Sequence, residues 1–114
     1  MTLSPEKVAS LAKSAAEDKK ARDVIILNIH DISVICDFFV ICSGYSSVQV
    51  KAIAENVEEK LEENGIKKLR MEGFKDARWV LLDYGSVVVH VFQESDREFY
   101  NLEHLWGDAK VVHL

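Results

Sequence analysis

The chain has 114 residues, of which 48% are hydrophobic and 29% are charged, and this length suits one hydrophobic core better than two. Its net charge is −5 and its lysines and arginines are scattered, which disfavours a direct nucleic-acid-binding surface. No stretch approaches the roughly 18 apolar residues of a membrane span, and the first residues lack a secretory signal, so we expect residues 1–114 to form a single cytoplasmic domain.

The first predicted element is a helix near the N-terminus. Ser4 is placed as its N-cap and Pro5 as its first residue, where the missing backbone N–H costs little. Apolar residues then recur at helical spacing, and the helix should end near residues 19–20. Because the apolar stripe is largely alanine, we expect this helix to pack closely against a sheet.

Two strands are predicted next, separated by a segment that the pattern leaves open. Residues 24–27, reached from a start at Arg22, and residues 38–42 are continuous apolar runs rich in strand-forming residues. Continuous rather than alternating apolarity indicates central strands covered on both faces. Residues 33–36, between them, are too few to assign and could form a helical turn.

The strongest helix signal in the chain follows Ser46 and Ser47, which are placed to cap it. Asn64 and Gly65 indicate its end. The glutamate-rich side of this helix is either a solvated surface or an electrostatic attraction for a partner. The apolar stripe consists of Val50, Ile53, Ala54, Val57 and Leu61.

The second half of the chain predicts a short strand and then a β-hairpin. Residues 68–72 form the possible strand, which would end at Gly73. Residues 79–83 and 87–92 are two apolar runs so close together that they predict an antiparallel pair. If residues 85–86 form the two-residue turn, the register of the pair follows from it.

That register divides the hairpin into two different faces. One face is uniformly apolar and includes Tyr84, whereas the other combines large aromatics with a carboxylate and an imidazole. Such a mixture is typical of an interface, but it also fits a core face that is covered by helices. The mixed face pairs Trp79 with Phe92, Leu81 with His90, and Asp83 with Val88.

A last helix is predicted before the C-terminus. Ser95 and Glu98 match a capping box, and Gly107 is placed to stop the helix. We expect its apolar face, made of Phe99, Leu102 and Trp106, to dock as core, with loose chain at both termini. In sum, the elements predict an α/β fold whose mixed β-sheet of about five strands is flanked by helices.

Groups able to do chemistry occur only singly, so we expect a binding module and no enzyme. The sequence lacks the glycine-rich phosphate loops, the metallopeptidase and hydrolase motifs, and the Asp-x-Asp pair typical of two-metal sites. We therefore predict no catalytic residues, no metal site and no cofactor. The isolated candidates are Asp37, Asp83, His30, His90 and Ser43.

The two cysteines are predicted to be buried free thiols. Cys36 and Cys42 stand six residues apart in apolar surroundings. This spacing fits neither a Cys-x-x-Cys redox pair nor a zinc half-site.

A pattern of short motifs runs along nearly the whole chain and is most specific from Trp79 onward. It comprises Asp37-Phe38-Phe39-Val40-Ile41, Ser43-Gly44, Gln49-Val50, Glu72-Gly73, residues 79–85, residues 89–92 and residues 97–106. This pattern closely resembles the ribosomal silencing factor family, RsfS, also called Iojap.

The resemblance implies a nucleotidyltransferase-like α/β fold without transferase activity. It also implies binding to ribosomal protein L-fourteen on the large ribosomal subunit, which would sterically block joining of the small subunit and repress translation under nutrient limitation. Large-subunit biogenesis is an alternative role, and family members also form homodimers. An acidic chain agrees with a basic ribosomal partner. The resemblance places partner-binding residues at Trp79, Leu81, Asp83, Tyr84, His90 and Phe92.

The resulting hypothesis gives each side chain a role. Trp79 and Phe92 would supply apolar contact area, Asp83 would pair with a basic residue of the partner, and His90 would donate or accept a hydrogen bond. Two rivals remain at this point. One is an active nucleotidyltransferase with a metal at Asp37 or Asp83, and the other is a general adaptor whose hairpin edge adds a partner's strand.

Overall fold

The computed structural model describes residues 3–30, 34, 36–100 and 110–114. Helices and strands follow one another along the chain in an order typical of an α/β fold. The elements are α1 (Pro5–Asp18), β1 (Arg22–Asn28), β2 (Phe38–Gly44), α2 (Ser47–Glu63), β3 (Arg70–Glu72), β4 (Trp79–Asp83), β5 (Val87–Gln93), α3 (Glu94–Tyr100) and β6 (Lys110–Val112).

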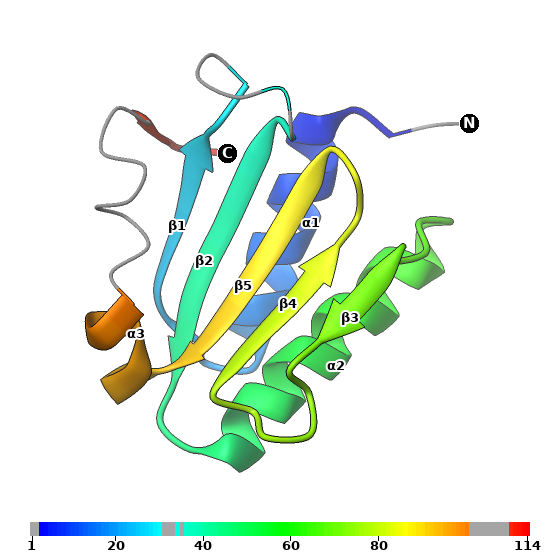
Figure 1. The fold of residues 1–114 in the computed structure, drawn as a ribbon. Helices are drawn as coiled ribbons and strands as arrows, with labels where there is room; N and C mark the ends of the chain where they lie inside the picture. Colours follow the sequence, from blue (N-terminus) through cyan, green and yellow to red (C-terminus); the bar gives the residue numbers. More distant parts are fainter. Residues whose placement is uncertain (1–2, 31–33, 35, 101–109) are drawn as a thin grey trace.

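The strands of the described residues form one mixed sheet in the order β3-β4-β5-β2-β1-β6 (Figure 1). β2 and β5 are parallel at its centre, and the other neighbouring pairs are antiparallel. The mixed sheet is confirmed, with six strands where about five were predicted, whereas the predicted loose C-terminus is wrong, because β6 pairs with β1. The three residues of β6 are too few for a strand pattern to be visible in the sequence. Their conformation follows from pairing with the backbone N–H and C=O groups at the edge of β1.

β2 is buried along its whole length, as its continuous apolarity predicted. The same expectation holds only in part for β1, where Ile26 and Leu27 are buried but Val24 and Ile25 are partly exposed. The reason is the short outer neighbour of β1, since β6 pairs with only the last three residues of that strand.

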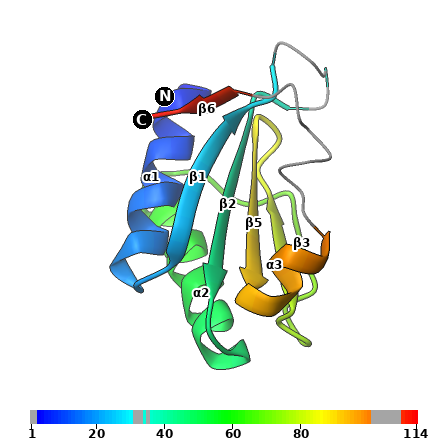
Figure 2. The same ribbon diagram turned by 90° about the vertical axis from the view of Figure 1, so that its left-hand side faces the viewer.

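α1 and α2 lie side by side on one face of the sheet (Figures 1 and 2). Ser4 and Ser46 cap them as predicted, because each serine Oγ accepts a backbone N–H at 3.2 Å. The alanine-rich stripe of α1 permits close approach, and the Asn56 side chain donates to the Ala15 carbonyl at 2.7 Å. All five predicted apolar positions of α2 are fully buried. None of the described helices is both long and apolar enough to cross a membrane.

α3 begins at Glu94, so the prediction that Ser95 caps it is wrong. β5 extends to Gln93 and continues directly into the helix, which leaves Ser95 inside the first turn. Figure 2 shows α3 on the opposite side of the sheet from α1. The side chain of the predicted docking residue Phe99 is not described, and Leu102, Trp106 and the predicted stop at Gly107 lie outside the described residues, as do Ser33 and Ile35 of the segment 33–36.

The β4–β5 hairpin has the predicted register. Trp79 pairs with Phe92 and Leu81 with His90, and the Tyr84 N–H donates to the Val87 carbonyl at 2.9 Å. The turn depends on Gly85, whose φ of +84° lies in the left-handed region.

The loop before β4 depends on Gly73, which has a φ of +78°. A Cβ at this position would lie 2.1 Å from the Trp79 carbonyl oxygen, so the backbone can approach this closely only at a glycine. The Ala77 N–H donates to the Gly73 carbonyl at 2.9 Å and closes the loop. Gly73 therefore helps to place the first residue of the hairpin.

Gly73→Ala is expected to lower the free energy of unfolding by about 3 kcal/mol or more, since it adds a clash to the cost of a left-handed alanine. Gly65→Ala is the matched control: φ there is +82°, but nothing lies within 4 Å of the new Cβ, so a loss of about 1 kcal/mol is expected. Urea unfolding of both variants measures the difference. Equal losses would show that the approach to Trp79 carries no constraint.

Candidate partner-binding face

The two faces of the hairpin have different surroundings. Val80, Leu82 and Val89 are fully buried beneath α1 and α2. Tyr84 belongs to the same helix-covered cluster and is 9% exposed. The structure therefore separates Tyr84 from the other five predicted site residues. Burial, followed by the charges of Glu58 and Glu62, raises the pKa of its hydroxyl.

The opposite face of the hairpin brings the other predicted residues together. We call it the hairpin face and define it by Trp79, Leu81, Asp83, Val88, His90 and Phe92. Along β4 its side chains are partly exposed, whereas along β5 they are buried.

Phe92 is fully buried, so it offers no contact area to a partner in this conformation. Its ring instead stacks against that of Trp79, with centroids 5.0 Å apart and an interplanar angle of 25°. Trp79 is partly exposed. In this aromatic pair the Trp79 ring is therefore partly exposed and the buried Phe92 ring supports it.

A hydrogen bond joins the two strands across this face. The Trp79 indole Nε1–H donates to Nδ1 of His90 at 3.1 Å. Since the indole nitrogen is only a donor, Nδ1 must be the acceptor, and the neutral imidazole then carries its proton on Nε2. Burial lowers the pKa of His90 to about 4, which keeps the ring neutral near pH 7.

Nε2 of His90 is buried and has no hydrogen-bond partner within the part of the chain that the structure describes. His90 itself is 4% exposed. The Phe39 ring lies edge-to-face with the imidazole at 4.7 Å between centroids. A buried N–H without an oxygen or nitrogen acceptor costs free energy in the unbound protein.

Asp83 lies at the outer end of the face and is held by two contacts. Arg70 Nε donates to one carboxylate oxygen at 3.1 Å, and the Gly85 N–H donates to the other at 2.8 Å. Arg70 also pairs with Glu72 at 2.8 Å. The carboxylate is thus part of the turn as well as a charge on the face.

A pocket of about 250 Å³ opens on the hairpin face. Leu69, at its rim, is 73% exposed, which is unusual for a large apolar side chain. The sequence did not indicate Leu69 or Phe39 as site residues, because they reach the pocket from outside the hairpin and only sheet pairing brings them there. The lining residues are Phe39, Leu69, Arg70, Leu81, Asp83, Gly85, Val88 and His90.

α3 is held at the end of this face by ion pairs and hydrogen bonds. Arg78, just before β4, pairs with the buried Asp96 at 2.9 Å. Arg97 donates to the Asp23 carbonyl at 2.8 Å and to the buried Ser43 Oγ at 3.0 Å. Ser43, one of the isolated candidates for chemistry, is therefore an acceptor that positions α3.

The remaining candidate groups do not converge on the hairpin face. His30 Nδ1 and the Asp37 carboxylate lie 2.6 Å apart at the other end of β2. Both cysteines are free and buried, as predicted. Burial raises the pKa of Cys36 to about 11 and that of Cys42 to about 12, so neither is a thiolate near pH 7.

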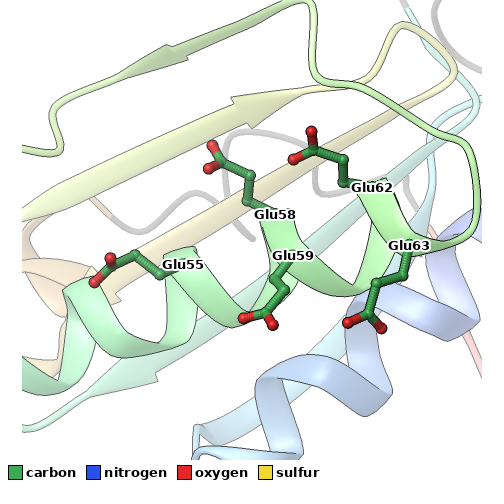
Figure 3. Close-up of a pocket in the computed structure, with 5 residues that line it drawn as sticks. All are labelled: Glu55, Glu58, Glu59, Glu62 and Glu63. Atoms are coloured by element: carbon green, nitrogen blue, oxygen red, sulfur yellow. The ribbon is translucent and has the colours of Figure 1, made fainter.

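The acidic side of α2 forms a second pocket of about 400 Å³ on the helix-covered side of the molecule. Figure 3 shows Glu58 and Glu62 pointing toward the strands and Glu59 and Glu63 pointing toward the neighbouring helix. Glu58 pairs with Lys68 at 2.6 Å. The lining consists of Glu55, Glu58, Glu59, Glu62 and Glu63, and a row of carboxylates alone does not identify a ligand.

Comparison with known proteins shows to which family the chain belongs. The profile of the family described as "Ribosomal silencing factor during starvation", RsfS, matches residues 2–114. The chain therefore belongs to the ribosomal silencing factor family, as its motifs predicted, and its relatives are named as regulatory factors, not enzymes.

Individual relatives cover almost the whole chain. It is 46% identical to "Ribosomal silencing factor RsfS" of Bacillus subtilis over 98% of this chain and 95% of that protein. It is 51% identical to the protein of the same name from Halalkalibacterium halodurans, over 98% and 96%. A crystal structure of a Chromobacterium violaceum protein superposes with a TM-score of 0.90 at 37% identity, over 92% of this chain and 88% of that one.

The buried neutral His90 predicts a pH dependence of stability. In the unfolded chain its pKa is near 6.5 and in the folded chain about 4, so between these values only the unfolded state takes up the proton. The free energy of unfolding should therefore fall as the pH falls from 6.5 to 4, by about 3 kcal/mol from this group. Urea unfolding across this range measures it, with His90→Gln as a control that cannot titrate. Parallel pH curves for wild type and variant would refute the assignment.

Proposed function

We propose that this protein docks through its hairpin face on ribosomal protein L-fourteen of the large ribosomal subunit and so blocks joining of the small subunit. The proposal rests on family membership together with one observation: partly exposed apolar side chains lie beside a carboxylate on the side of the sheet opposite α1 and α2. Repression of translation under nutrient limitation follows from the block, and we place the protein in the cytoplasm, where ribosomes are.

The geometry refines the roles of the site residues. Trp79 and Leu81 are partly exposed and supply contact area, with Phe92 as the support beneath the tryptophan. Asp83 is held by the turn and offers its carboxylate to a basic residue of the partner. Tyr84 packs beneath α2 and acts through the shape of the turn, not by contact.

Inhibition by this route requires no chemistry. A bound body of 12.9 kDa at the surface where the subunits meet excludes the small subunit by its volume. The degree of inhibition then depends only on the affinity of the protein for the large subunit. The net charge of −5 favours approach to a basic ribosomal protein.

The rival functions are less well supported by the geometry. Strand addition to the hairpin edge is obstructed, because β3 already pairs with β4 on that side. For a nucleotidyltransferase, Asp37 or Asp83 would need to hold metal, yet each carboxylate is already paired, with His30 and Arg70 respectively. Assistance in large-subunit biogenesis uses the same docking and stays an alternative outcome.

Leu69→Asp is expected to weaken binding to purified large subunits by roughly tenfold or more, since it places a charge at the rim of the apolar pocket on the hairpin face. Val48→Asp is the matched control, because Val48 is 77% exposed in the first turn of α2, on the helix-covered side. Both positions are exposed, so neither change should unfold the protein.

Sucrose gradients of mixed subunits provide the functional measurement. Wild-type protein and Val48→Asp should reduce the joined-ribosome peak, and Leu69→Asp should not. A wild-type protein that binds large subunits without reducing that peak would favour the biogenesis role. Equal behaviour of both variants would place the docking surface elsewhere.

We further propose that self-association, where it occurs, uses the same hairpin face and competes with ribosome binding. Leu69→Asp should then shift a dimer toward monomer in analytical ultracentrifugation, and Val48→Asp should leave it unchanged. A cross-linked dimer that still sediments with large subunits would contradict the competition.

A further inference from the structure

Strand β3 places a cation beside the carboxylate that the proposed docking offers to a partner. β3 lies next to β4 at one end of the described sheet (Figure 1), and Arg70 stands directly opposite Asp83. Successive side chains of a strand point to opposite faces, and Met71 packs with the helix-covered cluster. Arg70 and Glu72, on either side of Met71, therefore belong to the hairpin-face side of the sheet.

The two carboxylate oxygens of Asp83 have different partners. Oδ1 accepts the Gly85 N–H at 2.8 Å and so belongs to the turn. Oδ2 accepts from Arg70 Nε at 3.1 Å, and no other donor among the described residues bonds to it. The Asp83 side chain is 22% exposed and lines the pocket, so a docked partner can reach it. Oδ2 is thus the oxygen that a basic partner side chain would bind, and Arg70 already occupies it.

The contact between Arg70 and Asp83 is of a kind that exchanges readily. It consists of one hydrogen bond and lacks the second bond of a bidentate arginine–carboxylate pair. The Arg70 side chain is 57% exposed, and exposed ion pairs add little net stability because water solvates both charges. Arg70 Nη1 also donates to Glu72 at 2.8 Å. Arg70 can therefore leave Asp83 and keep an anionic partner on its own strand.

A basic side chain of a docked partner and Arg70 would compete for the same oxygen. Among the described residues that line the pocket, Arg70 is the one cation. Like charges placed together across an interface lower the affinity, so two cations at Asp83 are unfavourable. Binding of a basic partner at Asp83 then includes the cost of moving Arg70 away.

We propose that Arg70 is an intramolecular competitor, which occupies Asp83 in the free protein and lowers the affinity of the hairpin face for a basic partner. On docking, a lysine or arginine of the partner replaces Arg70 at Asp83, and Arg70 stays paired with Glu72. This inference rests on the proposed docking function and adds a residue that limits its affinity.

Replacing Arg70 tests the competition, because the expected change is opposite in sign to the loss of a supporting residue. Arg70→Gln frees Asp83 and should bind purified large subunits about threefold to fivefold more tightly than wild type, as the small net stability of an exposed ion pair implies. Arg70→Lys keeps a cation beside Asp83 and should stay within about twofold of wild type. Equal or weaker binding of Arg70→Gln would overturn the inference.

Lys68→Gln is the matched control for net charge. Lys68 is also a cation in an ion pair, but its partner is Glu58 of α2, at 2.6 Å, on the helix-covered side. Both substitutions remove one positive charge, so a general attraction to a basic partner rises equally in both. A gain of affinity confined to Arg70→Gln supports competition at Asp83, whereas an equal gain in Lys68→Gln contradicts it.

A double-mutant cycle assigns the effect to Asp83. Asp83→Asn keeps a side-chain oxygen for the Gly85 N–H but removes the charge, and it should bind about tenfold more weakly. In this background Arg70→Gln should give no gain, because no carboxylate is left to free. A full gain in that background, or undiminished binding of Asp83→Asn, would show that Arg70 does not act through Asp83.

Failure of the proposed function and failure of this inference give different results. Wild-type protein that does not bind large subunits overturns the proposed function. Wild-type binding without a gain in Arg70→Gln overturns this inference alone and leaves the docking intact. Thermal unfolding of every variant is measured in parallel, so that affinities are compared between folded proteins.

Discussion

The alternation of side chains along the β4–β5 hairpin is the constraint from which the rest of the site follows. A strand places successive residues on opposite faces, so a slip of one residue would exchange the two sets. Gly85 prevents the slip, because the turn requires a left-handed residue at that point. As a consequence of this register, Val80 and Leu82 face the helices, while Trp79, Leu81 and Asp83 face away from them.

The same alternation determines the burial and protonation state of His90. The histidine lies opposite Leu81 and next to the Trp79–Phe92 pair, where burial keeps it neutral. The indole hydrogen bond satisfies one ring nitrogen and leaves the other as a buried donor. An apolar residue here would avoid that cost.

The acidic side of α2 and the hairpin face are located on different sides of the molecule. The glutamates of α2 lie with the helices, away from the hairpin face, where the ion pairs of Arg70 with Asp83 and Glu72 leave little free charge. In the proposed docking, long-range attraction to a basic partner and short-range apolar fit would therefore be open to independent change. This division agrees with steering by net charge and specificity by a small contact region.

Local patterns were sufficient to predict both capped helices, the central strand β2, the hairpin and its register, because capping, periodicity and turn chemistry act between near neighbours in the chain. They did not predict β6, whose conformation depends on pairing with β1 more than eighty residues away in the sequence. The family motif also placed Tyr84 and Phe92 among the partner-binding residues, since membership of a motif does not indicate how deeply a side chain is buried. Only tertiary packing buried these two rings and brought Phe39 and Leu69 to the pocket, because burial and sheet neighbours depend on the arrangement of the whole chain.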